Sequence, residues 1–138
     1  MRKSKAAYMN YVCPSCFRKL HECTCNFFPP WTLLFIDERI QSHVRILNEK
    51  GYTTNGSCEG HHTGRPGANT AICFCMDYPE IVGSELPDGF NYNKAKHAIW
   101  HFYDQKLGRE AFEQEKAAEL MKLLDWCRSL PDNPRAIR

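Results

Sequence analysis

The chain has 138 residues, of which 43% are hydrophobic and 25% are charged, as in an ordinary globular protein. Its length favours one domain with room for a small appendage, and its net charge of +2 neither requires nor excludes a nucleic-acid partner. The sequence has no run of about 18 apolar residues, so no membrane-spanning helix is expected. Nor do the first twenty residues include an apolar segment of the signal-peptide kind, so we expect a cytoplasmic protein. In that compartment the eight cysteines would be free thiols or metal ligands rather than disulfides.

Basic residues gather at both ends of the sequence. Arg2, Lys3 and Lys5 precede every acidic residue, and Arg135 and Arg138 lie at the other end. Such ends can contact phosphate groups, or they can be solvated tails that keep the protein in solution.

Four cysteines close to the start of the chain predict a metal site. Cys13 and Cys16 form a Cys-x2-Cys turn, and Cys23 and Cys25 follow as a Cys-x-Cys pair. Zinc takes four thiolates in a tetrahedron, at about 2.3 Å from each sulfur, so the two pairs can complete one closed site. His21 is a spare ligand that could replace Cys23 or Cys25. We therefore predict a structural zinc knuckle with its linker over residues 1–31.

Two alternatives exist for these cysteines. The Cys-Pro-Ser-Cys stretch from residue 13 to residue 16 could be a redox motif of the glutaredoxin kind, but that motif needs a βαβ context, and no helix-length segment follows. The second alternative is that the four cysteines have no structural purpose, but four such thiols within thirteen residues would be an oxidation hazard. The unit ends in Phe27-Phe28-Pro29-Pro30-Trp31, where the prolines favour an extended linker. Its aromatic side chains could dock the knuckle on the main domain or stack on bases.

Residues 32–138 predict an α+β domain. The expected elements, in chain order, are a buried strand at 32–36, a helix capped by Asp37 and closed by Gly51, a β-prone segment at 52–54 with a turn at Asn55-Gly56, a strand at 70–76, a loop at 77–88, a hairpin of 90–92 with 97–103, and a helix at 109–130. This order indicates a small mixed or antiparallel sheet with two main helices on one face.

Apolar spacing predicts which faces are buried. In the first helix the apolar positions are Ile36, Ile40, Val44 and Leu47. In the strand at 70–76, Ile72, Phe74 and Met76 share one face, and Ala71, Cys73 and Cys75 share the other. In the last helix the expected apolar side consists of Phe112, Leu120, Leu123, Leu124 and Cys127.

The stretch from Ser57 to His62 is the second candidate site. Cys58, Glu59, His61 and His62 supply a thiol, a carboxylate and two imidazoles, next to small residues that let a ligand approach the backbone. Cys58 with His61, and Glu59 as acid or base, could be catalytic, although the sequence shows no third group to orient them. A structured turn with hydrogen-bonded side chains and a buried Cys58 is the plainer interpretation.

A second zinc site is a further possibility for this stretch. Cys58 and His61 have the spacing of metal ligands, and Cys73 and Cys75 share one face of the following strand. Together these side chains could complete a site.

The segment from Asp37 to His61 resembles a motif of the wybutosine-synthesising protein 3 family. It contains a helix that ends in Leu-Asn-x-x-Gly-Tyr-x-Thr, followed by Ser-Cys-x-Gly. Members of that family methylate a modified guanine in tRNA with S-adenosylmethionine, and the resemblance implies roles for Thr54, Ser57, Cys58 and Gly60. The sequence departs from the motif at Glu59 and His61, where the family tends to have serine and arginine.

Nearly the whole chain is similar to small uncharacterised proteins of Firmicutes and their phages. In those proteins a cysteine knuckle precedes a Gly-Tyr-x-Thr-x-x-x-Cys-Glu-Gly-His core, which here is residues 51–61, and a C-terminal helix. This resemblance implies an architecture and a phage or mobile-element setting, but no activity.

Three functions are compatible with these patterns. The one we expect is a small zinc-binding accessory protein that binds nucleic acid or a host nucleic-acid enzyme, for example as an inhibitor of host defence. The second is an RNA- or nucleotide-modifying enzyme with Cys58, Glu59 and His61 at its catalytic centre. The third is a metal- or redox-sensing protein that uses Cys58, Cys73 and Cys75.

Overall fold

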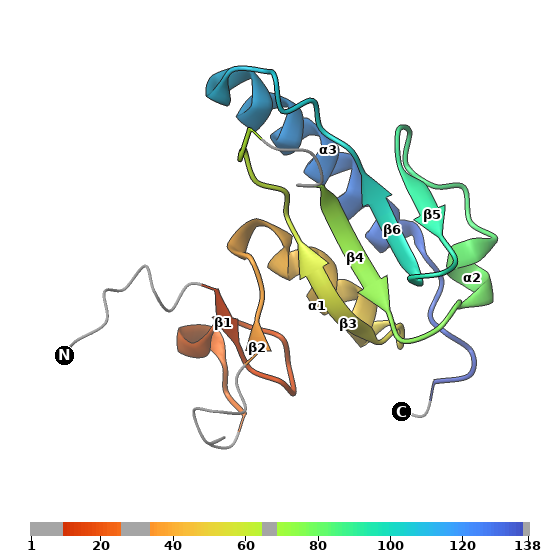
Figure 1. Ribbon diagram of the computed structural model, residues 1–138. Helices are drawn as coiled ribbons and strands as arrows, with labels where there is room; N and C mark the ends of the chain where they lie inside the picture. Colours follow the sequence, from red (N-terminus) through yellow and green to blue (C-terminus); the bar gives the residue numbers. More distant parts are fainter. Residues whose placement is uncertain (1–9, 26–33, 65–68, 137–138) are drawn as a thin grey trace.

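The described residues form two antiparallel sheets and three α-helices. The computed structural model describes residues 10–25, 34–64 and 69–136 (Figure 1). The elements, in chain order, are β1 (Tyr11–Val12), the 3-10 turn η2 (Leu20–Glu22), β2 (Leu34–Phe35), the 3-10 turn η4 (Glu38–Ile40), α1 (Gln41–Glu49), β3 (Thr54–Cys58), β4 (Thr70–Phe74), α2 (Pro79–Val82), β5 (Asn91–Asn93), β6 (Ala98–His101) and α3 (Arg109–Ser129). The predicted α+β class is confirmed.

The larger sheet has the strand order β3-β4-β6-β5, and every neighbouring pair is antiparallel. Both α1 and α3 lie on one face of this sheet, as predicted (Figure 1). Ile72 and Phe74 lie two positions apart in β4, so their side chains point to the same face of the sheet. Both side chains are fully buried there. Met76, which was expected to share this face, is exposed because it lies beyond the end of β4.

The apolar stripe predicted for the first helix is confirmed. Ile40, Val44 and Leu47 are almost completely buried, and Ile36 is buried just before η4. Gly51 ends the helix with φ +93°, and a Cβ at this position would lie 2.5 Å from the Cβ of Ala136. Only glycine fits this backbone conformation and this space.

The ends of α1 and α3 are tied together by one lysine. Lys50 Nζ donates to the carbonyl oxygens of Cys127 at 3.0 Å, Arg128 at 2.6 Å and Leu130 at 2.5 Å. The last carbonyls of a helix lack intrahelical partners and carry partial negative charge, so an ammonium group there is stabilising.

Three local predictions are wrong. Asp37 makes no side-chain cap, because its carboxylate accepts the backbone N–H of Glu59 at 3.1 Å instead. The expected turn at residues 55 and 56 is absorbed into β3, where the ladder shifts register between Thr54 and Gly56. Part of the expected loop at 77–88 forms the short helix α2.

The predicted buried strand at 32–36 is also different. Its described part, β2, pairs with β1 rather than with the main sheet, and Leu34 and Phe35 are 37% and 62% exposed. Residues 26–33 lie outside the described residues, and with them the predicted linker of Phe27 to Trp31 and the expected domain boundary between residues 31 and 32.

The hairpin of β5 and β6 and the long helix α3 are where the sequence places them. On α3, Phe112, Leu120, Leu123 and Cys127 are buried as expected. Leu124 is only half-buried, and Trp126 takes the core position instead.

Candidate metal centre

The four cysteines of the predicted knuckle converge on one centre. The Sγ atoms of Cys13, Cys16, Cys23 and Cys25 all lie within 4.8 Å of one another, and none of these residues forms a disulfide. His21 does not join them, because its Nε2 lies 3.5 Å from Glu22 Oε1 on the surface. The group can hold a metal ion with four sulfur ligands.

The backbone of residues 10–25, called the cysteine knuckle below, positions these thiols. Phe17 N–H donates to Cys13 O at 2.9 Å and Cys13 N–H donates to Arg18 O at 3.0 Å, which closes the first turn. Phe17 has a φ of 60°, a left-handed conformation that costs about 1 kcal/mol in a residue other than glycine. In each pair a backbone amide points at sulfur: Ser15 N–H at Cys13 and Cys25 N–H at Cys23, both at 3.3 Å.

The crowding of the sulfur atoms separates their pKa values. Burial raises the pKa of Cys13, but hydrogen bonds from the Cys16 and Ser15 backbone and from neighbouring thiols outweigh it and bring the pKa to about 7. At Cys23 the amide of Cys25 lowers the pKa, yet desolvation and the other thiols raise it to about 12. The cluster therefore does not carry four thiolates by itself at neutral pH, and a bound cation would supply the charge that holds them.

The cysteine knuckle packs against the main layer beside α1 and β3 (Figure 1). Val12 is fully buried in the common core, and Phe17 packs against that core. Lys19 Nζ lies 3.2 Å from Glu38 Oε1 and adds a partly exposed ion pair. The cysteine knuckle therefore shares the hydrophobic core of the larger sheet and its helices.

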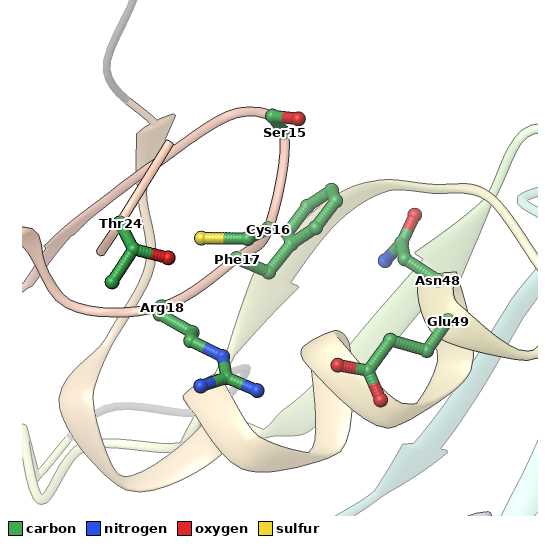
Figure 2. A pocket seen from close by; sticks show the side chains of 7 residues that line it. All are labelled: Ser15, Cys16, Phe17, Arg18, Thr24, Asn48 and Glu49. Carbon is green, nitrogen blue, oxygen red and sulfur yellow. The ribbon is translucent and has the colours of Figure 1, made fainter. Parts of the chain in front are cut away.

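Two hollows lie where the cysteine knuckle meets the domain. Figure 2 shows the first, a cavity of about 420 Å³ between the knuckle and the last turn of α1, lined by Ser15, Cys16, Phe17, Arg18, Thr24, Asn48 and Glu49. The second, of about 170 Å³, is called the β3 groove here and is lined by Phe17, Leu34, Phe35, Ile36, Asn48 and residues 53–57. Because β3 is an edge strand of the larger sheet, the β3 groove runs along an open sheet edge.

A second convergent group forms at the end of β3. Ligand atoms of Asp37, Cys58 and His61 lie within 4.8 Å of one another. Asp37 Oδ2 is 3.1 Å from His61 Nε2, and Gly60 N–H donates to Cys58 Sγ at 3.4 Å. Asp37 is therefore the third side chain of this group, beside Cys58 and His61, and the sequence did not reveal it.

The thiol of Cys58 is a weak nucleophile in this setting. Burial raises its pKa, which the Gly60 amide only partly offsets, and the negative charge of Asp37 raises it further. Because the thiolate is the reactive form, a raised pKa argues against a catalytic pair of Cys58 and His61.

The side chain of Glu59 is buried and forms an ion pair with Lys116. Its Oε2 accepts from Lys116 Nζ at 2.7 Å, and the same ammonium donates to Gly60 O at 3.0 Å. Both side chains are buried, and Thr70 Oγ1 donates to the Glu59 carbonyl at 2.7 Å. The carboxylate that the sequence made an acid or base candidate therefore anchors the loop to α3.

Lys116 was not among the predicted site residues, although the sequence contains a signal for it. Lys116 stands four residues from both Phe112 and Leu120, on the apolar side of α3. A lysine at a core position of a helix indicates a buried partner of opposite charge.

The remaining predicted site residues are kept apart. His62 packs its ring 5.0 Å from that of Phe112, and its Nε2 lies 2.8 Å from Leu107 O, so it supports the loop. Ser57 pairs with Ile72 inside the sheet and lines the β3 groove.

Cys73 and Cys75 do not complete the second group. The register places Ala71 opposite Cys58 and Cys73 opposite Gly56, while Cys75 Sγ lies 3.1 Å from Tyr78 Oη. Asp37 takes the place that the sequence assigned to these two cysteines.

The fold and the two groups define a small α+β chain with a four-cysteine centre able to hold a metal ion. Comparisons with known proteins found no significant match to a protein-family model, to a curated protein or to a solved structure. Within residues 10–25, 34–64 and 69–136, no helix combines the length and the hydropathy needed to cross a lipid bilayer.

Proposed function

We propose that this chain is a small zinc-binding accessory protein, which binds a macromolecular partner through a surface organised by its zinc knuckle. The single observation that supports this proposal is the convergence of four sulfur atoms on one centre. Four protein ligands fill a tetrahedral zinc ion and leave no position for a substrate, so such an ion is structural. Tetrahedral sites of four sulfurs also suit iron, and metal analysis distinguishes the two.

The partner would contact the β3 groove. Phe35 is 62% exposed on one wall, held by an edge-to-face contact with Tyr11 at a ring-centroid distance of 5.4 Å. Asn48, Asn55 and Ser57 supply polar groups to the lining of the same groove. Exposed aromatic rings stack on bases, and polar groups along an extended strand can hydrogen-bond a nucleic-acid backbone.

Nucleic acid is accordingly the first candidate partner, and an enzyme that acts on nucleic acid is the second. Arg18 and Glu49 both line the adjoining cavity, so a contact to phosphate there would come from Arg18 (Figure 2). The phage or mobile-element setting and a role against host defence rest on the resemblance of the sequence alone and belong to the same proposal.

A nucleotide-modifying enzyme receives less support. Glu59 is held in a buried ion pair with Lys116, and burial raises the pKa of Cys58. Neither group is therefore placed to transfer a proton or attack a substrate.

The test is a gel shift of the zinc-loaded protein with single-stranded RNA, single-stranded DNA and duplex DNA at two salt concentrations. We expect binding that weakens as salt rises, since contacts to phosphate release counterions. Phe35→Ala should weaken binding about tenfold, because stacking of a base on an aromatic ring contributes about 1–3 kcal/mol. Phe102→Ala is the matched control, because Phe102 is 53% exposed but lies outside the β3 groove.

The outcomes separate the two partners. If neither RNA nor DNA binds at low salt, the nucleic-acid proposal is wrong and a protein partner is tested by pull-down, with the Phe35→Ala variant as the negative control. If no partner of either kind depends on Phe35, the proposed function is contradicted.

A further inference from the structure

The group of Asp37, Cys58 and His61 combines an oxygen, a sulfur and a nitrogen donor. It is distinct from the cysteine knuckle, and its members come from two segments: the residue before η4, and the end of β3 with the loop that follows. This donor set is one that zinc accepts, with carboxylate, thiolate and imidazole in one coordination sphere.

The separation of two of the donors is that of neighbouring ligands on one metal. Zinc lies about 2.0–2.1 Å from oxygen and nitrogen ligands, so the edge of its tetrahedron is about 3.3 Å. Asp37 Oδ2 and His61 Nε2 are 3.1 Å apart, and the Cys58 donor completes a triangle with no side longer than 4.8 Å. This limit of 4.8 Å accommodates the longer zinc–sulfur bond of about 2.3 Å.

Cys58 repeats a local geometry of the cysteine knuckle. Gly60 N–H donates to Cys58 Sγ at 3.4 Å. In the knuckle the amide two residues further on likewise points at Cys13 and at Cys23, each at 3.3 Å. The shared turn gives the sulfur of Cys58 the same local backbone setting as two of the knuckle sulfurs.

Contacts with the core and with α3 fix the loop that carries Cys58 and His61. Gly60 has a φ of +93°, and a Cβ there would lie 2.9 Å from Tyr103 Cε2, so the chain passes close to the core at this point. The buried pair of Glu59 and Lys116 fixes the preceding residue to α3. Asp37 is fixed in turn, because its Oδ2 accepts the Glu59 N–H at 3.1 Å. Donors held in this way are pre-organised for a ligand.

One side of the group faces solvent. The side chain of His61 is 53% exposed, whereas that of Asp37 is 16% exposed. Three protein donors and an exposed side leave one coordination position for water.

We propose that Asp37, Cys58 and His61 bind a second zinc ion, with its fourth position open to water and with faster exchange than the ion of the cysteine knuckle. The knuckle ion should exchange more slowly because four thiolates bind it, whereas only one thiolate binds the second ion. The proposal goes beyond partner binding and depends on its own three ligands, so either site can fail without the other. A chain with one fixed and one exchangeable zinc ion could report the zinc level to its partner.

The experiment counts the zinc bound to the full-length chain. Purified protein is equilibrated with buffered Zn²⁺, and zinc per chain is measured before and after treatment with a weak chelator. We expect a second equivalent that the chelator removes while the knuckle ion stays. His61→Gln, Asp37→Asn and Cys58→Ser should each abolish the second equivalent, whereas Cys16→Ser should remove the knuckle equivalent and spare the second.

Two matched controls are built into the chain. Asp77 Oδ1 and His97 Nδ1 form another surface pair at 2.9 Å, in which no thiol takes part. His97→Gln should therefore leave both equivalents in place, and so should Cys73→Ser.

Substitution with Co²⁺ gives a readout that does not depend on zinc counting. Charge transfer from sulfur to cobalt grows with the number of thiolates, so the ion at the second group should absorb more weakly than the ion in the cysteine knuckle. The His61→Gln variant, which changes an exposed side chain, should fold normally and lose only this weaker spectrum. Wild-type protein that binds a single zinc equivalent, or a second equivalent that survives in both His61→Gln and Cys58→Ser, would overturn the proposal.

Discussion

Replacement of Lys116 by methionine tests whether Glu59 is structural. The side chain of Lys116 is 4% exposed and that of Glu59 is 11% exposed, with Nζ and Oε2 2.7 Å apart. Lys116→Met leaves the Glu59 carboxylate buried without its cation and removes a donor from the Gly60 carbonyl. Loss of one partner from a buried ion pair costs about 3–5 kcal/mol, because the remaining charge stays desolvated.

Glu113, which also contacts Lys116, should add little to this loss of stability because its side chain is exposed. Its Oε2 lies 3.5 Å from Lys116 Nζ and 2.8 Å from Arg39 Nη1, and its side chain is 40% exposed, so it keeps a cationic partner and contact with water when the lysine is removed. We therefore expect a loss of about 3 kcal/mol in the free energy of unfolding, the lower end of that range. This is a large part of the 5–15 kcal/mol that is typical of small domains.

The assay is urea unfolding, followed by circular dichroism, of four proteins: wild type, Lys116→Met, Glu59→Gln and the double variant. In the double variant both charges are absent, so it should be more stable than Lys116→Met alone. Glu113→Gln is the control and should change stability by less than about 1 kcal/mol, as an exposed group does. If Lys116→Met costs less than about 1 kcal/mol, or if the two single effects simply add, the buried pair does not anchor the loop.

Three further predictions concern other parts of the molecule. Cys16→Ser should release the knuckle metal and lower the melting temperature below that of the zinc-loaded wild type, because the ion contributes folding energy, while Cys75→Ser should change neither. Lys50→Met should lower the free energy of unfolding by about 1–2 kcal/mol in urea titrations, since three carbonyls at the end of α3 lose a cationic donor; an unchanged midpoint would contradict this role. Burial lowers the pKa of His43, whose Nε2 lies 2.7 Å from Leu120 O. The unfolded chain therefore binds this proton more readily, and stability should fall as the pH drops below about 6.5; His43→Gln should weaken that fall in urea titrations at about pH 7.5 and 5.5.

The features that the sequence predicted well are local. The four knuckle cysteines occupy one short stretch, so their spacing alone indicates a common centre. The stripe of Ile40, Val44 and Leu47 follows from helical periodicity, which does not depend on the packing partner. Gly51 was equally clear, because a left-handed residue after a helix is usually glycine.

The features that were missed depend on contacts between distant residues. Asp37 stands before a helix, where an aspartate ordinarily caps, and only the fold shows that its carboxylate is used by Glu59 and His61. The apolar residues Leu34 and Phe35 predict a buried strand, but the strand that they form pairs with β1, and both side chains are exposed. Cys73 has the right chemistry for a ligand, and a register that no local pattern encodes places it opposite Gly56 instead.

The most direct test of the central claim is X-ray absorption at the zinc edge of the His61→Gln variant, in which only the cysteine knuckle should retain an ion. The proposed centre predicts one zinc per chain with four sulfur neighbours at about 2.3 Å. Protein that carries no stoichiometric zinc, or zinc surrounded mainly by oxygen and nitrogen, would contradict it.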